Sequence, residues 1–258
     1  MKYIVETRGL SKSYGDKQVV RDVDLKVPKG CVYGFMGPNG AGKSTTLKML
    51  LGLVRASRGE ARIAGKEMNQ KNRLEILKET GSLIESPSYY GHLTGRENLE
   101  IVRTLKNAPE KEIDQVLKLV RMERQQNKKA REYSLGMKQR LGLAAALIGK
   151  PELLILDEPT NGLDPAGIQE IRELICELPR RMGITVLVSS HLLSEMDQMG
   201  IEGRVTEEGI LIPGFSDDRT ADLVSALAAG GAGLFRVEER QKSLEDIFLS
   251  LTGRRESL

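Results

Sequence analysis

The chain has 258 residues, of which 40% are hydrophobic and 29% are charged, as expected for a globular protein with a sizeable core. A net charge of only +3 and an aromatic content of 4% without tryptophan argue against a nucleic-acid partner. No apolar run approaches the roughly 18 residues of a membrane span, the start lacks a signal-peptide pattern, and Cys31 and Cys176 fall in predicted core segments, so we expect a cytoplasmic protein with buried thiols.

The N-terminal segment predicts a small antiparallel sheet. Apolar and polar residues alternate over residues 3–7 and again over residues 19–27. Turn-forming residues occupy positions 13–16 and 28–30. A period of two residues with turns at these places is typical of half-buried antiparallel strands.

A glycine-rich loop joins a predicted buried strand at residues 31–36 to a predicted helix at residues 45–53. Its glycines permit turns that direct backbone N–H groups at phosphate oxygens, its lysine adds a positive charge, and its serine hydroxyl can ligate Mg²⁺. We therefore predict a bound nucleotide, with an ordinary glycine-rich turn as the alternative. The loop residues are Gly37, Pro38, Asn39, Gly40, Ala41, Gly42, Lys43, Ser44 and Thr45.

The middle of the chain is predicted to be helical. Residues 59–65 are expected to add a strand to the N-terminal β lobe, and a charged stretch follows at residues 66–79. From residue 86 to residue 148 the apolar pattern takes a helical period, as at Ile113, Val116, Leu117 and Val120. We expect a helical insertion between two parts of an α/β core.

Two further buried strands, separated by an amphipathic helix, end in polar side chains. Residues 151–158 end in Asp157 and Glu158, and residues 184–190 end at His191. Because the carboxyl ends of parallel strands meet at one sheet edge, where nucleotides bind in open α/β folds, we expect these side chains to lie together. Asp157 could hold Mg²⁺, and Glu158 could polarise the water that attacks the γ-phosphate. Alternatively, Asp157 and Glu158 are a surface pair that caps a helix, and His191 is a structural residue.

Together these segments resemble the ATP-binding subunit of an ABC transporter over roughly residues 1–199. Residues 133–140, Tyr-Ser-Leu-Gly-Met-Lys-Gln-Arg, are similar to the signature sequence of that family. The resemblance implies an α/β fold of the P-loop NTPase class and ABC type, with a mixed central sheet, an N-terminal antiparallel β lobe and a helical insertion. It divides the chain into an ATP-binding core (residues 1–85 and 149–212), a helical subdomain (residues 86–148) and a C-terminal α/β tail (residues 213–258).

The resemblance also implies roles for single residues. By similarity, Lys43 clamps the phosphates, Glu158 is the catalytic base and His191 senses the γ-phosphate. Ser44 and Asp157 are the implied Mg²⁺ ligands. Further nucleotide contacts are implied for the rest of residues 37–45 and for Tyr14, Ser134, Gly136 and Asp164. By its spacing alone, Tyr14 is equally well a half-exposed turn residue or a ring that stacks on the base.

Two positions depart from the common pattern of the family. The glutamine usual at the junction of core and helical insertion is Glu85 here. A carboxylate can still accept a hydrogen bond from metal-bound water, but it adds negative charge near Mg²⁺. The signature has Leu135 and Met137 in place of the glycine and glutamine of the commoner S-G-G-Q form. Both variants are similar to the subgroup that exports peptide antibiotics, of the bacitracin or lantibiotic type, and related drugs.

The resemblance implies two kinds of partner. One is a second ATP-binding subunit in a head-to-tail homodimer or pseudo-dimer, with each ATP between Lys43 of one subunit and Ser134 and Gly136 of the other. The other partner is separate multi-span membrane subunits, which makes this chain a peripheral protein on the inner face of the cell membrane. The aromatic cluster within Ser86 to Leu99 is our candidate docking surface, and a solvent-exposed loop is the alternative.

The C-terminal part departs from the order of segments in the family. Either residues 205–212 form a short hairpin, or a segment after Met199 is absent, which is the alternative we favour. Beyond it we expect a helix at residues 218–227, a strand at residues 233–237 and an amphipathic helix at residues 243–249.

We therefore expect an Mg²⁺-dependent ATPase that drives export of a drug or peptide antibiotic through separate membrane subunits. An importer subunit is one alternative. A soluble ABC-type ATP switch that acts on ribosomes or nucleic acid is another, but the single phosphate loop, the single signature and the lack of sustained heptads count against it. The sequence does not identify the transported compound, because in such systems the membrane subunits contact it.

Overall fold

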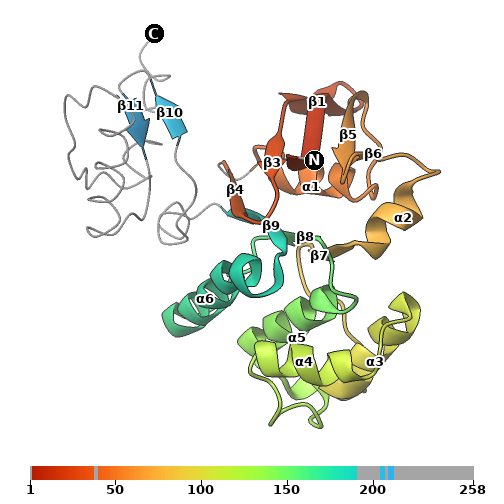
Figure 1. The fold of residues 1–258 in the computed structure, drawn as a ribbon, viewed down its shortest axis with the longest axis vertical. Coiled ribbons are helices and arrows are strands. Elements are labelled where there is room, and N and C mark those ends of the chain that lie inside the picture. The colour runs from red at the N-terminus through yellow and green to blue at the C-terminus, as the bar shows by residue number, and fades with distance from the viewer. Residues whose placement is uncertain (1, 38–39, 191–203, 207–208, 212–258) are drawn as a thin grey trace. The chain divides into compact units, whose positions relative to one another are not determined.

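The computed structural model describes residues 2–37, 40–190, 204–206 and 209–211. The chain divides into two compact units, Met1–His191 and Leu192–Leu258. The first unit contains an antiparallel sheet, a parallel sheet and several helices (Figure 1). The predicted α/β fold with an N-terminal β lobe and a helical insertion is confirmed.

The N-terminal sheet is antiparallel in the order β2-β1-β5-β6, with β3 also paired to β1. Its strands are β1 (Tyr3–Tyr14), β2 (Lys17–Val23), β3 (Lys26–Pro28), β5 (Arg58–Ile63) and β6 (Lys66–Glu67). Their apolar side chains, such as Val5, Val27 and Ile63, are buried in one core with side chains of the following helix. Both the predicted N-terminal sheet and the predicted strand near residues 59–65 are confirmed.

The second sheet is parallel in the order β4-β9-β8-β7. Its strands are β4 (Val32–Met36), β7 (Thr80–Leu83), β8 (Leu153–Asp157) and β9 (Thr185–Ser190). Every residue of β8 is buried, as its uninterrupted apolar run predicts. β4 is half-buried rather than buried, and its last residue, Met36, is exposed. We did not predict β7, because its sequence Thr-Gly-Ser-Leu has neither the composition nor the length of a clear strand.

Helix α1 (Lys43–Leu50) contacts strands of both sheets, and its Leu47 and Leu50 are buried in their shared core. It begins at Lys43 rather than at Thr45, because Gly42 in the left-handed conformation turns the chain directly into the helix. Helix α6 (Pro165–Met182) matches the predicted amphipathic helix. The short helix α2 (Arg73–Lys78) was missed, since it has only six residues, buries only Ile76 and lies in a charged stretch.

The helical insertion consists of α3 (Gly95–Lys106), α4 (Lys111–Leu119), the 3-10 turn η1 (Ala130–Glu132) and α5 (Leu135–Leu147), grouped together in Figure 1. A capping box starts α3: the Thr94 hydroxyl accepts a hydrogen bond from the Glu97 N–H, and the Glu97 carboxylate accepts one from the Thr94 N–H. These hydrogen bonds lower the pKa of Glu97.

In the second unit, β10 (Arg204–Thr206) and β11 (Gly209–Leu211) form an antiparallel hairpin. The hairpin given as one alternative for residues 205–212 is therefore present, and the elements predicted over residues 218–249 lie outside the described residues. Within the described part of the chain, no helix combines the length and hydrophobicity that a bilayer span requires.

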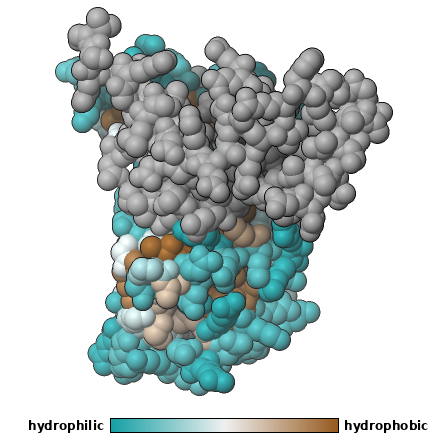
Figure 2. Space-filling model, turned by 90° about the vertical axis from the view of Figure 1, so that its left-hand side faces the viewer, coloured by the Kyte–Doolittle hydropathy of each residue, from teal (hydrophilic) through white to brown (hydrophobic). Residues whose placement is uncertain are grey.

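The described surface visible in Figure 2 is mostly hydrophilic, with a smaller apolar area. The two thiols are less deeply placed than predicted, because Cys31 and Cys176 are half-buried rather than buried. Partial burial raises the pKa of the Cys176 thiol.

Candidate functional site

The glycine-rich loop lies at the carboxyl edge of the parallel sheet, between the end of β4 and the start of α1. Gly40 and Gly42 both have left-handed backbone, with φ of 83° and 87°. At Gly42 a Cβ would lie 2.6 Å from the carbonyl oxygen of Val19. A larger residue would therefore force the loop and β2 apart. Pro38 and Asn39 lie outside the described residues.

Lys43 is the buried cation of this edge, with an exposed fraction of 7%. Its Nζ donates a hydrogen bond to the carbonyl oxygen of Gly37 at 2.7 Å, and it lies 3.4 Å from a carboxylate oxygen of Glu158. A buried ammonium requires oxygen partners of this kind. The N-terminus of α1 adds partial positive charge at the same place. The surroundings therefore fit phosphate oxygens.

Asp157 and Ser189 meet across the neighbouring strands β8 and β9. The Ser189 hydroxyl donates a hydrogen bond to the Asp157 carboxylate at 2.6 Å, and both side chains are buried. Glu158 has a left-handed backbone (φ 50°), and its N–H donates to both the carbonyl oxygen and the hydroxyl of Ser189. Ser189 thus fixes both carboxylate residues, and the parallel register of the two predicted strands could have revealed it.

The first turn of α1 supplies hydroxyl groups beside the buried cation. Ser44 and Thr45 are half-buried. Thr46, which we did not single out, donates its hydroxyl hydrogen to the Gly42 carbonyl oxygen at 2.9 Å and fastens the loop to the helix.

The same edge offers oxygen ligands of the type that Mg²⁺ prefers. Mg²⁺ is commonly held by one or two protein side chains together with phosphate oxygens. The Ser44 hydroxyl and the buried Asp157 carboxylate suit that small donor set. No cluster of three or more metal-ligating His, Cys, Asp or Glu side chains occurs among the described residues. The donors at this edge therefore suit a metal ion that is shared with phosphate.

Glu85 lies two residues after β7, at the edge where β8 ends in Asp157. Its backbone is left-handed, with φ of 62°. Its carboxylate is paired with Lys48 of α1, with 2.5 Å between Nζ and the nearer carboxylate oxygen. The sequence placed Glu85 near the metal but did not identify this cation partner.

Two further predicted residues lie at the margins of the site. Tyr14, the last residue of β1, is 51% exposed, and the Nζ of Lys12 lies 4.8 Å from the centre of its ring. Such a ring agrees with both interpretations, a base-stacking residue and a turn residue. His191 directly follows β9 and lies outside the described residues, so its role stays a prediction.

The signature segment begins α5 with exposed residues. Ser134 is the N-cap, and its hydroxyl oxygen accepts a hydrogen bond from the N–H of Met137 at 3.3 Å. Ser134 and Leu135 are exposed and Gly136 is half-buried. The preceding Tyr133 is buried and donates its hydroxyl hydrogen to the carbonyl oxygen of Gln125 at 2.7 Å. Burial raises the pKa of that tyrosine, so it remains a neutral anchor for the segment.

The turn before α6 lies against the signature segment. Asp164 is exposed and caps α6 by accepting a hydrogen bond from the N–H of Gly167 at 3.0 Å. A Cβ added to Gly162 would lie 3.0 Å from a methyl carbon of Leu135, so the two segments are in close contact. Arg140 strengthens the connection by pairing with Glu170 of α6. Ser134 and Asp164 are thus presented by two joined elements.

The candidate docking segment is ordered by Asn98 of α3. The Asn98 amide accepts a hydrogen bond from the Tyr90 N–H at 2.7 Å and donates to the carbonyl oxygens of Tyr90 and Thr94. Tyr90 remains 56% exposed and contacts His92 edge to face. The segment is therefore a structured surface with an exposed aromatic side chain, and its role in docking stays a prediction.

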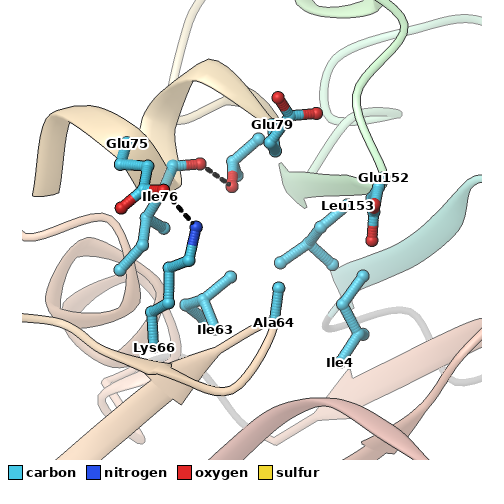
Figure 3. Close-up of a pocket in the computed structure, with 10 residues that line it drawn as sticks. Ile4, Ile63, Ala64, Lys66, Glu75, Ile76, Glu79, Glu152 and Leu153 are labelled. Atoms are coloured by element: carbon cyan, nitrogen blue, oxygen red, sulfur yellow. Dashed lines mark hydrogen bonds and ion pairs between the residues drawn. The ribbon is translucent and has the colours of Figure 1, made fainter. Parts of the chain in front are cut away.

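Figure 3 shows a small pocket at the opposite end of the parallel strands. Thr80 and Leu153, which begin β7 and β8, line it. An ion pair between Lys66 and Glu75, 2.5 Å apart, lies at its side. The pocket is therefore separate from the glycine-rich loop, which lies at the carboxyl ends of the strands. Sheets of this kind bind nucleotides at those carboxyl ends.

Comparison with known proteins gives matches over most of the chain. The family model for ABC transporters matches residues 20–161. The bacitracin transport ATP-binding protein BcrA of Enterococcus faecalis is 46% identical over 214 residues, which are 82% of this chain and 69% of that protein. The lantibiotic transport ATP-binding protein SrtF of Streptococcus pyogenes is 43% identical over 196 residues, which are 76% of this chain and 83% of that protein.

A solved structure with a similar fold contains nucleotide. The ATP-binding cassette MJ0796, a dimer in a post-hydrolysis state with ADP and Pi, superposes with a TM-score of 0.68 at 27% identity. The match covers 75% of this chain and 90% of that one. Both kinds of comparison agree with the phosphate-binding geometry of the loop.

Proposed function

Because this chain belongs to the ABC transporter family, as an ATP-binding subunit that hydrolyses ATP, we propose that it drives export of a peptide antibiotic or similar drug. The relatives that transport bacitracin and lantibiotics support this substrate class. The structural observation that carries the ATP-hydrolysing part of this function is the buried Lys43 between the glycine-rich loop and Glu158, which places a phosphate-binding group beside a candidate base.

We assign the chemistry to residues at the carboxyl edge of the parallel sheet. Lys43 and the backbone N–H groups of the loop bind the phosphates. Ser44 and Asp157 hold Mg²⁺, with Glu85 as a further acceptor toward its water, and the ion neutralises phosphate charge when bound. Glu158 orients and polarises the attacking water. Ser189 keeps Glu158 in place by accepting a hydrogen bond from the Glu158 backbone N–H.

The exposed residues of the site contact the nucleotide of a second copy or of a related subunit. Subunits of this family dimerise, as in the MJ0796 dimer. In our proposal Ser134, Gly136 and the N-terminus of α5 face the γ-phosphate held by the other subunit, and Asp164 crosses the same interface. The exposure of Ser134 and Asp164 supports it, because neither is covered within the described part of the chain. Tyr14 would stack on the adenine, and His191 would sense the γ-phosphate.

Subunits of this family work with separate membrane subunits. We propose that these dock on Ser86 to Leu99, and that the chain is therefore peripheral on the inner face of the cell membrane. We also propose an ATP-binding core of residues 1–85 and 149–212, a helical subdomain of residues 86–148 and a tail of residues 213–258. The helical group that follows Glu85 in the structure supports the first of these boundaries.

The test uses tagged full-length chain that carries Glu158→Gln, expressed in membranes of its source cell with ATP present. Slowed hydrolysis should hold the dimer closed on its partners, and we expect a multi-span membrane protein to copurify. Matched preparations with Tyr89→Glu and Tyr90→Glu should lose that protein if the docking surface is correct. Copurification of ribosomes or nucleic acid alone would instead support a soluble switch and overturn the exporter proposal.

A further inference from the structure

An ion pair joins two elements of the nucleotide edge. Lys48 lies in the last turn of α1, and its Nζ is 2.5 Å from a carboxylate oxygen of Glu85. Glu85 lies between β7 and the helical insertion, with the left-handed backbone that residues with a Cβ seldom adopt. The pair therefore connects the helix that begins at Lys43 with the segment that leads into the insertion.

Glu85 adds a negative charge to an edge that already has carboxylates. Leu83 of β7 is paired with Leu156 of β8, so Glu85 follows its strand at the same edge where Asp157 ends the neighbouring one. Glu158 adds a further carboxylate there, and bound nucleotide adds several negative charges. Like charges gathered at one site raise the free energy of the ionised forms unless cations balance them.

We propose that Lys48 is a positioning residue that makes a glutamate workable at position 85. It neutralises one carboxylate oxygen and ties α1 to the start of the helical insertion. The other oxygen of Glu85 has no protein partner in the described part of the chain, so it can still accept a hydrogen bond from water. This inference rests on the proposed function, since it takes the edge to be the ATP site.

The test is a double-mutant cycle on the full chain with Lys48→Met and Glu85→Gln, singly and together. We expect Lys48→Met to raise the KM for ATP about threefold to fivefold, the scale of a partly exposed ion pair. In the Glu85→Gln background the same substitution should change KM little. The charge exchange Lys48→Glu with Glu85→Lys should recover part of the loss, which a packing role of Lys48 would not allow. High salt should shrink the effect.

The chain offers a matched control in Lys66→Met. The Lys66–Glu75 pair has the same 2.5 Å separation and similar exposure but lies beside the pocket at the other end of the strands. Its loss should leave KM unchanged. Equal effects of Lys48→Met in both backgrounds would overturn the inference. The same cycle measured on Tm without nucleotide detects the ion pair alone, so an absence of ATPase activity would count against the proposed function and not against the pair.

Discussion

The phosphate edge and the signature segment differ in how far each is completed within one copy of the chain. Lys43, Asp157 and Ser189 are 7%, 2% and 0% exposed. Ser189 donates a hydrogen bond to Asp157, and Lys43 donates one to the carbonyl oxygen of Gly37. Ser134 and Asp164, by contrast, are exposed helix caps. This difference agrees with our proposal, in which the buried edge binds the phosphates within one copy and the exposed caps face the phosphates bound by another copy.

Burial and exposure also divide the free-energy consequences of mutation. Removal of a buried charged group destabilises the surrounding structure, because its hydrogen-bond partners are left buried and unsatisfied. An exposed cap contributes about 1 kcal/mol to its own helix and little beyond it. Substitutions at the two regions should therefore separate chemistry from assembly.

The largest effect is expected when the buried side is broken by Lys43→Met. Turnover of ATP should fall by roughly 100-fold or more, the scale of losing a preorganised charge at the reacting group. Nucleotide binding should weaken as well, because no other described cation occupies the place of Lys43 between Gly37 and Glu158. The measurement is steady-state ATPase activity together with binding of a fluorescent ATP analogue.

Lys29→Met is the matched control for Lys43→Met. Lys29 also pairs with a glutamate, Glu152, at 3.0 Å, but it is exposed and lies at the amino end of the strands. Its loss should leave turnover within about twofold, as for most exposed ion pairs. A Lys43→Met chain that retained wild-type turnover would contradict the role of the buried edge.

A smaller effect is expected on the exposed side, from Ser134→Ala. Turnover should fall roughly tenfold, because a hydrogen bond to a charged group contributes about 1.5 kcal/mol. ATP binding to a single copy should remain, because in our proposal Ser134 contacts the nucleotide held by the other copy. ATP-dependent dimerisation, followed by size-exclusion chromatography with Glu158→Gln present, should weaken.

Ser134→Thr separates this role from helix capping. Threonine keeps both a hydroxyl and a good N-cap, so the variant should recover most of the turnover. Loss of Tm by about 2–4 °C in Ser134→Ala is expected from the cap alone. If Ser134→Ala weakened ATP binding by isolated monomers as strongly as Lys43→Met does, the division between the two regions would be wrong.

The smallest effect is expected from the second deeply placed lysine, Lys106 at the end of α3. Its Nζ is buried and lacks a hydrogen-bond partner among the described residues, and desolvation lowers its pKa. No phosphate-binding role justifies this charge, so Lys106→Met should stabilise the fold by about 1 kcal/mol. Removing Lys43 would then impair the protein, whereas removing Lys106 would stabilise it slightly.

The pH dependence provides the check on Lys106. Its folded-state pKa lies below the ordinary value of 10.5, so the unfolded chain binds this proton more tightly than the folded chain. The penalty is therefore complete at neutral pH and disappears as the pH rises toward 10.5. Thermal unfolding should show a gain from Lys106→Met at neutral pH that shrinks at alkaline pH, and a constant or growing gain would contradict the assignment.

Local patterns allowed much of the phosphate edge to be predicted. The glycine spacing identified the loop, and the apolar run of β8 placed Asp157 at a buried strand end. Ser189 was missed because its partner lies 32 residues away, and only the register of β8 with β9 brings them together. The Lys48–Glu85 pair was missed for the same reason.

The elements that escaped prediction have few local signals. β7 is a short strand whose Gly81 packs against the backbone of α5, so tertiary contact rather than residue preference makes it a strand. α2 buries one side chain and lies in a charged stretch. By contrast, α3 and α4 have strong amphipathic periodicity and α3 begins with a capping box, so helices could be predicted in this part of the chain from local sequence.

The close approach of Gly42 to Val19 has a consequence for protein engineering. The glycine-rich loop packs directly against the backbone of β2, although the two segments are separated in sequence. The loop is thus not a portable cassette of nine residues. If the loop, its strand and its helix were grafted into another α/β scaffold, the contact with β2 would be missing. We therefore expect that a functional graft must include the N-terminal sheet.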